Sequence, residues 1–205
     1  MISARAALER LREGNRRFAS DRPTGATVAD RTRRSAEQEP FAIVLGCSDA
    51  RVPAEIVFDQ GLGDLFVIRV AGNIVAASQI GSVEFAAEQF GTPLVVVLGH
   101  SGCGAVTATL DELRRPRDNQ SRNLRSIVDR IRPSVEVLLE TELKHDSDAL
   151  VRHAVRNNVR VSVNHLRHGS EVLEELQKQG LVIVGAEYSL ETGIVEFFEG
   201  IPPED

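Results

Sequence analysis

The chain has 205 residues, a net charge of −6, and 42% hydrophobic and 26% charged residues, a composition typical of soluble globular proteins. One domain accounts for this length, because domains most often contain about 100–200 residues. The negative charge disfavours a phosphate-backbone partner, and only 4% of the residues are aromatic, so no stacking platform for single strands is expected. We therefore expect no nucleic-acid partner.

Membrane association is not expected either. No run approaches the ~20 consecutive apolar residues that a membrane span needs, and the N-terminal residues lack the apolar centre of a signal peptide. These features predict a cytoplasmic location. In that reducing compartment the two cysteines are better interpreted as metal ligands or as buried small side chains than as a disulfide.

The chain begins with helical patterns. Apolar residues recur at helical spacing over Ser3–Phe18, and Asp21–Pro23 ends that pattern. A weaker helix is predicted over Val28–Ala36. The expected organisation is a single domain over residues 1–205, with an N-terminal helical arm at 1–36 and the core at 37–205.

The core is predicted to alternate strands and helices. Four short runs are apolar and rich in β-branched residues, as in parallel strands covered on both faces: Phe41–Leu45, Leu65–Ile68, Leu94–Leu98 and Leu181–Val184. Helical patterns follow at Ile80–Phe90 (with Gly91 as a cap), Ala105–Leu113, Leu124–Leu143, Asp148–Leu166 and Glu171–Gln179. A hairpin from Glu187 to Phe198 closes the chain. This order predicts an α/β fold with a mainly parallel central sheet flanked by helices and a C-terminal antiparallel edge strand.

Two of the predicted strands lead into residues that bind metals. Cys47 follows the first strand, and His100 and Cys103 follow the third, so adjacent strands would bring them into one crevice. Two thiolates and an imidazole favour zinc, and three protein ligands leave a fourth position open, as in catalytic sites. The alternative is that Cys47 and Cys103 are buried packing residues and His100 is a strand-end histidine satisfied by ordinary hydrogen bonds, which their joint position at strand ends disfavours.

Asp49 and Arg51 lie next to the first cysteine. A carboxylate and a guanidinium two residues apart are usually a weak surface ion pair. At this place Asp49 either occupies the fourth metal position, or bonds to Arg51 and accepts a hydrogen bond from metal-bound water. Arg51 suits the second arrangement, because it stays charged and binds carboxylates through two nitrogens.

The segments Cys47–Arg51 and His100–Gly104 resemble the paired motifs of β-class carbonic anhydrases of the plant type. Phe58–Asp64 and Arg69–Asn73 also resemble that family, and the similarity runs from about Leu8 to the closing hairpin. The resemblance implies one Zn²⁺ per subunit and a lyase that reversibly hydrates CO2 to bicarbonate and a proton, by attack of zinc-bound hydroxide on CO2. It also implies a homodimer or a dimer-based tetramer with active sites at the subunit interface.

A narrow apolar substrate cleft is also implied by the resemblance. Gln38 matches a glutamine that hydrogen-bonds the substrate, and Phe66 and Phe85 match aromatic lining residues, although Phe85 stands where plant-type enzymes have tyrosine. Ala71 replaces a larger aliphatic residue, and Gly104 completes the expected set. Two other functions remain open: hydrolysis of CS2 or COS at the same site, and a zinc protein without turnover.

Overall fold

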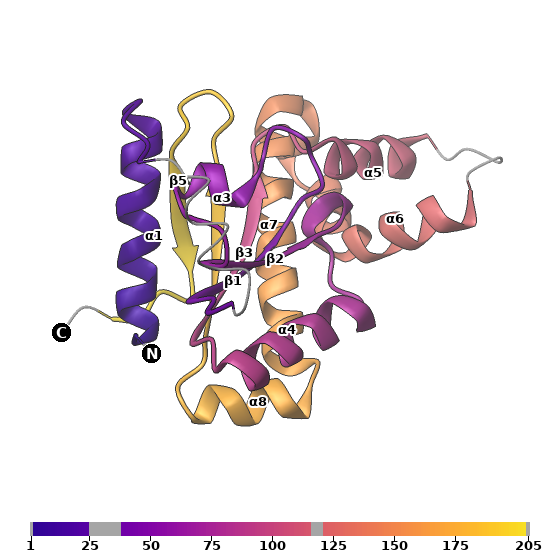
Figure 1. Cartoon of the computed structure of the whole chain (residues 1–205). Coiled ribbons are helices and arrows are strands. Elements are labelled where there is room, and N and C mark those ends of the chain that lie inside the picture. The colour runs from indigo at the N-terminus through magenta and orange to yellow at the C-terminus, as the bar shows by residue number, and fades with distance from the viewer. Residues whose placement is uncertain (1, 25–37, 116–120, 204–205) are drawn as a thin grey trace.

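The computed structural model describes residues 2–24, 38–115 and 121–203, which form helices around a five-stranded sheet (Figure 1). The strands are β1 (Ala42–Gly46), β2 (Leu65–Arg69), β3 (Leu94–His100), β4 (Val182–Tyr188) and β5 (Val195–Glu199). Their order in the sheet is β2-β1-β3-β4-β5. The first four strands run parallel, and β5 is antiparallel to β4, so the predicted fold class is confirmed.

The α-helices of the described residues are α1 (Ala4–Ala19), α3 (Ala54–Val57), α4 (Ala77–Phe90), α5 (Gly104–Arg114), α6 (Arg122–Val135), α7 (Ser147–His168) and α8 (Glu171–Lys178). Three short 3₁₀ segments accompany them: η1 (Ala71–Asn73), η2 (Glu136–Glu140) and η3 (Glu142–His145). Among the described residues, no helix combines the length and apolar character that crossing a membrane requires.

Both faces of the sheet are covered, which explains the uninterrupted apolar runs in the sequence. Successive residues of a strand point to opposite faces. On one face, Val44 and its equivalents pack with α1 and α3; on the other, Ile43 and its equivalents pack with α4, α7 and α8. The helix layers are visible on either side of the strands in Figure 1.

A third apolar cluster lies where the parallel strands end. It joins α5, α6 and α7, and it includes Cys47 and Cys103 among buried aliphatic side chains. Two of the three metal-ligand candidates, Cys47 and Cys103, are therefore buried in a packed apolar region.

Several predicted elements need correction or extension. The single helix predicted over Leu124–Leu143 is wrong: α6 ends at Val135 and is followed by η2 and η3. Pro133 lacks the N–H that a helix interior needs, so the last turn is weakened. The strand predicted to end at Val184 continues to Tyr188 through an irregularity after Gly185. The helix predicted over Val28–Ala36 lies outside the described residues.

Candidate metal centre

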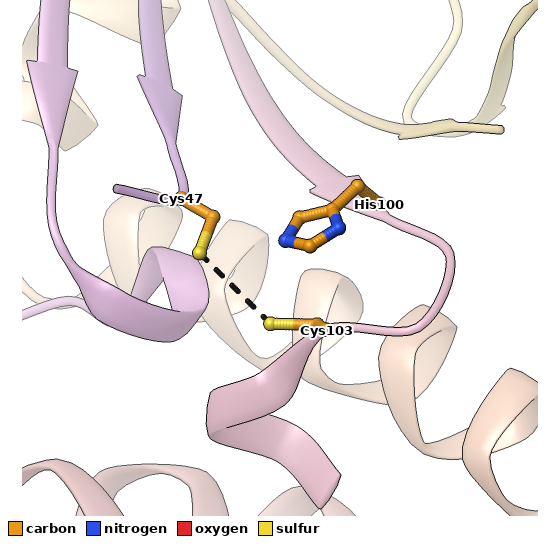
Figure 2. Close-up of side chains that lie close together, drawn as sticks. All are labelled: Cys47, His100 and Cys103. Carbon is orange, nitrogen blue, oxygen red and sulfur yellow. Dashed lines mark hydrogen bonds between the residues drawn. The ribbon is translucent and has the colours of Figure 1, made fainter. Parts of the chain in front are cut away.

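Three metal-ligand candidates meet at the carboxyl ends of β1 and β3. Cys47 is the first residue after β1, His100 is the last residue of β3, and Cys103 is the N-cap of α5. Because β1 and β3 are hydrogen-bonded parallel neighbours, their ends lie side by side. Figure 2 shows the three side chains converging from these elements.

The ligand atoms have the spacing of a metal site. The Sγ atoms of Cys47 and Cys103 are 3.9 Å apart, and the ligand atoms of Cys47, His100 and Cys103 all lie within 4.8 Å of one another. Two sulfurs at ~2.3 Å from a tetrahedral zinc ion would be ~3.8 Å apart. The sulfur pair therefore fits a zinc ion without rearrangement.

His100 is fully buried. Its Nδ1 lies 3.0 Å from the carbonyl oxygen of Ser101, which can only accept, so Nδ1 carries the proton. The Nε2 atom then presents a lone pair, and it is buried with no hydrogen-bond partner among the described residues. A buried unpaired acceptor is costly, and coordination of a metal ion would satisfy it.

The two thiols influence each other strongly. The contact between the two sulfurs lowers the pKa of Cys47, while the same contact and then burial raise the pKa of Cys103. The contact therefore favours loss of one proton from the pair. Thiolates are the form in which cysteines bind metals, so this pair is prepared for a cation.

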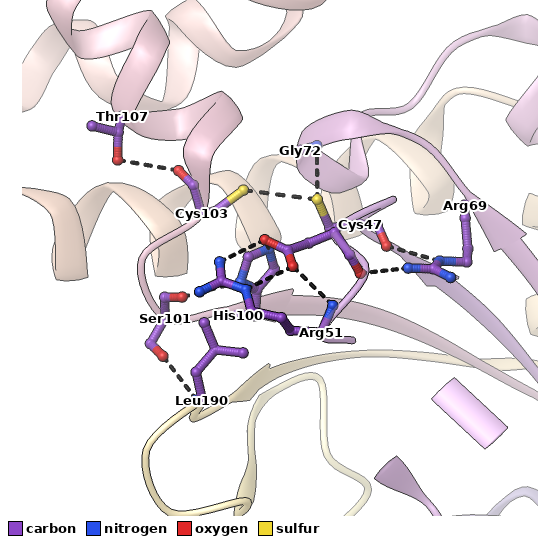
Figure 3. Close-up of polar contacts among 10 residues, drawn as sticks. Cys47, Arg51, Arg69, Gly72, His100, Ser101, Cys103, Thr107 and Leu190 are labelled. Carbon is purple, nitrogen blue, oxygen red and sulfur yellow. Dashed lines mark hydrogen bonds and ion pairs between the residues drawn. The ribbon is translucent and has the colours of Figure 1, made fainter. Parts of the chain in front are cut away.

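Backbone and side-chain donors hold the loop that carries the first ligand. The N–H of Gly72 donates to the Sγ of Cys47 over 3.3 Å. Arg69, at the end of β2, donates from Nε to the carbonyl of Cys47 at 3.0 Å and from Nη2 to the carbonyl of Asp49 at 2.5 Å (Figure 3). The loop is therefore tied to the neighbouring strand.

Asp49 is bound by Arg51 through both carboxylate oxygens. Its Oδ1 accepts from the backbone N–H and from Nε of Arg51, at 3.0 and 2.9 Å, and its Oδ2 accepts from Nη2 at 2.7 Å. These bonds hold the pKa of Asp49 well below its usual range. The same Oδ2 lies 3.9 Å from Nε2 of His100. The ionised carboxylate is thus beside the candidate metal ligands, while both of its oxygens are hydrogen-bonded to Arg51.

The residues expected to bind substrate fall into two groups. Gly104 directly follows Cys103, and Ala71 begins the η1 turn that contacts Cys47. Gln38, Phe66 and Phe85 lie elsewhere in the same chain.

The positions of Gln38 and Phe66 show how far these residues lie from the candidate metal ligands. Gln38 precedes β1 whereas Cys47 follows it, so the length of the strand separates them, at ~3.3 Å per residue. Phe66 pairs with Ile43 near the amino end of the sheet, and its ring centroid is 6.2 Å from that of Phe85 on α4. These side chains therefore lie away from the three candidate ligands of the same chain.

Two residues that support the Cys47 loop, Arg69 and Gly72, were not among the site residues predicted from the sequence. They belong to a segment that was noted only because it resembles the family, and they contact the loop from the end of β2 and from η1. Nothing local in the sequence specifies such contacts, because the partners are 20 to 25 positions apart.

Comparison with known proteins agrees with this geometry. The family model described as carbonic anhydrase matches residues 42–195. Carbonic anhydrase 2 of Mycobacterium tuberculosis is 38% identical over 190 residues, covering 92% of this chain and 89% of that protein. The carbonic anhydrase of Pseudomonas aeruginosa is 33% identical, covering 80% of this chain and 75% of that protein.

The same agreement holds for solved structures. The β-carbonic anhydrase CafA of Aspergillus fumigatus superposes with a TM-score of 0.72 at 27% identity, covering 97% of this chain and 91% of that one. A tetrameric β-carbonic anhydrase of Sordaria macrospora, at 21% identity, shares the fold with a TM-score of 0.71, covering 83% of this chain and 89% of that one. By its matched residues, its relatives and its fold, the chain belongs to the β-carbonic anhydrase family.

Proposed function

We propose that this chain carries out the reaction of its family, the reversible hydration of CO2 to bicarbonate and a proton, at a Zn²⁺ ion held by Cys47, His100 and Cys103. The observation that carries the proposal is the buried, unpartnered Nε2 of His100 beside two sulfurs 3.9 Å apart. Two sulfurs and one nitrogen are a soft ligand set that prefers zinc to magnesium or calcium. Three protein ligands leave one position for the chemistry.

A Zn²⁺ ion held by Cys47, His100 and Cys103 would act as a Lewis acid that lowers the pKa of a coordinated water and so supplies the nucleophile. Asp49 acts beside it as a hydrogen-bond acceptor that orients the attacking group toward carbon. The bonds from Arg51 hold this carboxylate ionised and fixed in direction. The Arg51 contacts also support the open arrangement, in which Asp49 is not the fourth ligand.

The substrate cleft is proposed to form between two copies of the chain, as a homodimer or a dimer-based tetramer. Phe85 supports this, because 52% of its surface is exposed although it contacts Phe66 and Phe90 in an aromatic cluster. Adjoining aromatic side chains that form an exposed apolar patch are typical of a contact surface. Gln38, Phe66 and Phe85 of one subunit would then line the centre of the other.

The two other candidate functions receive less support. Every relative compared above is named a carbonic anhydrase, which does not favour hydrolysis of CS2 or COS. A zinc protein without turnover needs a closed site, and the engagement of Asp49 by Arg51 argues against closure. Parallel stopped-flow assays with CO2 and CS2 would separate the substrates.

The ligand assignment is tested by removing ligands and counting metal. Cys47→Ser and His100→Ala are each expected to lose zinc and CO2 hydration, because a three-ligand site cannot spare one ligand. His168→Ala is the matched control, since that side chain is exposed and only weakly paired with Glu174 at 3.8 Å. Elemental analysis of protein never exposed to chelator provides the count. A full equivalent of zinc in either ligand variant would refute the assignment.

A further inference from the structure

The η1 turn delivers a backbone N–H to one of the ligand sulfurs. Gly72 and Asn73, at φ of 69° and 44°, are both in the left-handed region. Asparagine tolerates that region better than most residues, yet two such residues in succession are uncommon and need support from their surroundings. The consequence of this backbone path is the 3.3 Å bond from Gly72 N–H to Cys47 Sγ, drawn in Figure 3.

The support comes from helix α7. Asn158 donates from Nδ2 to the carbonyl of Gly72 at 2.8 Å, and Ser162 donates from Oγ to the carbonyl of Asn73 at 3.1 Å. The two donors are four residues apart and therefore lie on one face of the helix. Both are almost completely buried, at 2% and 3% exposure, so water does not compete for these bonds.

Packing confines the turn as well. A Cβ atom at Gly72 would approach Cδ1 of Ile131 to 2.7 Å and Cβ of Ala105 to 3.1 Å. The Nδ2 atom of Asn73 has no hydrogen-bond partner in the described part of the chain, so this amide nitrogen does not anchor the turn. The backbone of η1 is therefore held by the two α7 side chains, by the bond from the Asn73 N–H to the carbonyl of Val70 at 3.0 Å, and by close contact with α5 and α6.

We propose that Asn158 and Ser162 are positioning residues for the metal centre: by holding the carbonyls of η1, they aim the Gly72 N–H at the sulfur of Cys47. A hydrogen bond to a ligand sulfur draws charge from it, so the sulfur donates less to the metal and the metal remains a stronger Lewis acid. This inference rests on the proposed function, because it requires Cys47 to be a ligand.

The test uses the full chain with its zinc replaced by Co²⁺, whose thiolate-to-metal charge-transfer absorption reports on the ligand sulfurs. In Asn158→Leu and Ser162→Ala the N–H···S bond is expected to weaken, and the absorption should move to longer wavelength. Loss of such outer partners typically weakens metal affinity about 10–100-fold, because the ligand is no longer held in place, so in competition with a chelator the variants should release zinc at least ~10-fold more readily. Ser162→Thr keeps the hydroxyl and should resemble the unmodified chain.

Thr92→Val is the matched control. It also removes one buried hydroxyl that donates to a distant backbone carbonyl, that of Pro40 at 2.9 Å, but at the amino ends of the strands. It should change stability without moving the absorption.

The possible outcomes are distinct. If the unmodified chain with Co²⁺ shows no thiolate absorption, the metal centre itself is refuted. If that absorption is present but identical in Asn158→Leu and Ser162→Ala, with unchanged zinc release, the positioning role is refuted and the metal centre stands. If Asn158→Leu does not fold, the comparison of Ser162→Ala with Ser162→Thr and Thr92→Val decides the question.

Discussion

Two arginines act on the segment that follows β1, and they act on different atoms. Arg51 binds the carboxylate of Asp49, whereas Arg69 binds the backbone carbonyls of Cys47 and Asp49. Arg51 therefore controls the direction and charge of one side chain, and Arg69 holds the path of the chain. The two contributions can be separated by mutation.

Arg51→Ala should lower CO2 hydration by about 100-fold, the scale of a misplaced catalytic group, while zinc content stays at one per subunit. Without the guanidinium, the Asp49 carboxylate is free to take the open metal position. Stopped-flow rates and zinc analysis on the same preparation measure both effects.

Arg16→Ala serves as the control for the Arg51 variant. Its side chain is as exposed as that of Arg51, at 66% against 61%, and it lies 3.6 Å from the carboxylate of Glu9. The explanation fails if Arg51→Ala loses zinc in proportion to activity, because the guanidinium would then be needed for metal binding.

At the scale of elements, α1 is fastened to the core by a buried polar side chain. Asn15 donates to the carbonyls of Val57 and Gly193 and accepts from the N–H of Val195. These three bonds pair both amide hydrogens and the amide oxygen, so burial of this polar side chain does not destabilise the fold. The helix thereby joins α3 to the β4–β5 hairpin.

Close approach of α1 to α3 depends on Gly14. A Cβ atom there would lie 1.8 Å from the carbonyl oxygen of Phe58, so Gly14→Ala must displace the helix. We expect a loss of about 1–3 kcal/mol in the free energy of unfolding, as for other overpacked sites, measured by urea denaturation.

Gly81→Ala gives the contrast within α4. Nothing lies within 4 Å of a Cβ at that position, so alanine should stabilise the helix by about 0.5–1 kcal/mol through its propensity. Equal effects of the two substitutions would mean that helix propensity, and not the contact with Phe58, sets the result.

For the whole molecule, we propose that residues 1–205 form one domain. Leu8 and Leu11 of α1 belong to the same apolar cluster as β1, β3 and β4, so the N-terminal helix packs on the core. The cytoplasmic location expected from the sequence stays a prediction.

Assembly is tested through the exposed aromatic cluster. Phe85→Glu should shift the protein toward monomers and lower CO2 hydration by about 10-fold or more while zinc is retained, because a charge is costly in an apolar interface. Light scattering gives the mass, and stopped flow gives the rate. Leu124→Glu, at a similarly exposed apolar position on α6 (56% against 52%), is the control. An unchanged mass and rate for Phe85→Glu would place the subunit contact elsewhere.

The pH dependence of activity follows from the charge of the ligand set. Two thiolates offset the charge of a divalent ion and weaken its pull on a water proton, so the rate of CO2 hydration should climb from neutral into alkaline pH. Rates measured between about pH 6 and 9 at constant ionic strength test this. A flat profile would contradict the charge argument.

The amino-acid sequence by itself determined the α/β class, the strands of the sheet and the three residues that converge as candidate metal ligands. These depend on local signals: apolar runs mark buried parallel strands, and parallel strands place the residues that follow them at one edge. The end of α6 at Val135 was not predicted, because the apolar pattern continues to Leu143, although Pro133 disfavours a continuous helix.

Only the tertiary structure decided how the centre is supported. The bond from Asn158 to Gly72 joins residues 86 positions apart, and that from Ser162 to Asn73 joins residues 89 apart. No periodicity or motif encodes such pairs, since they arise from the packing of α7 against η1. The same holds for the separation of Phe66 and Phe85 from the ligands, which follows from where β2 and α4 lie in the sheet layers.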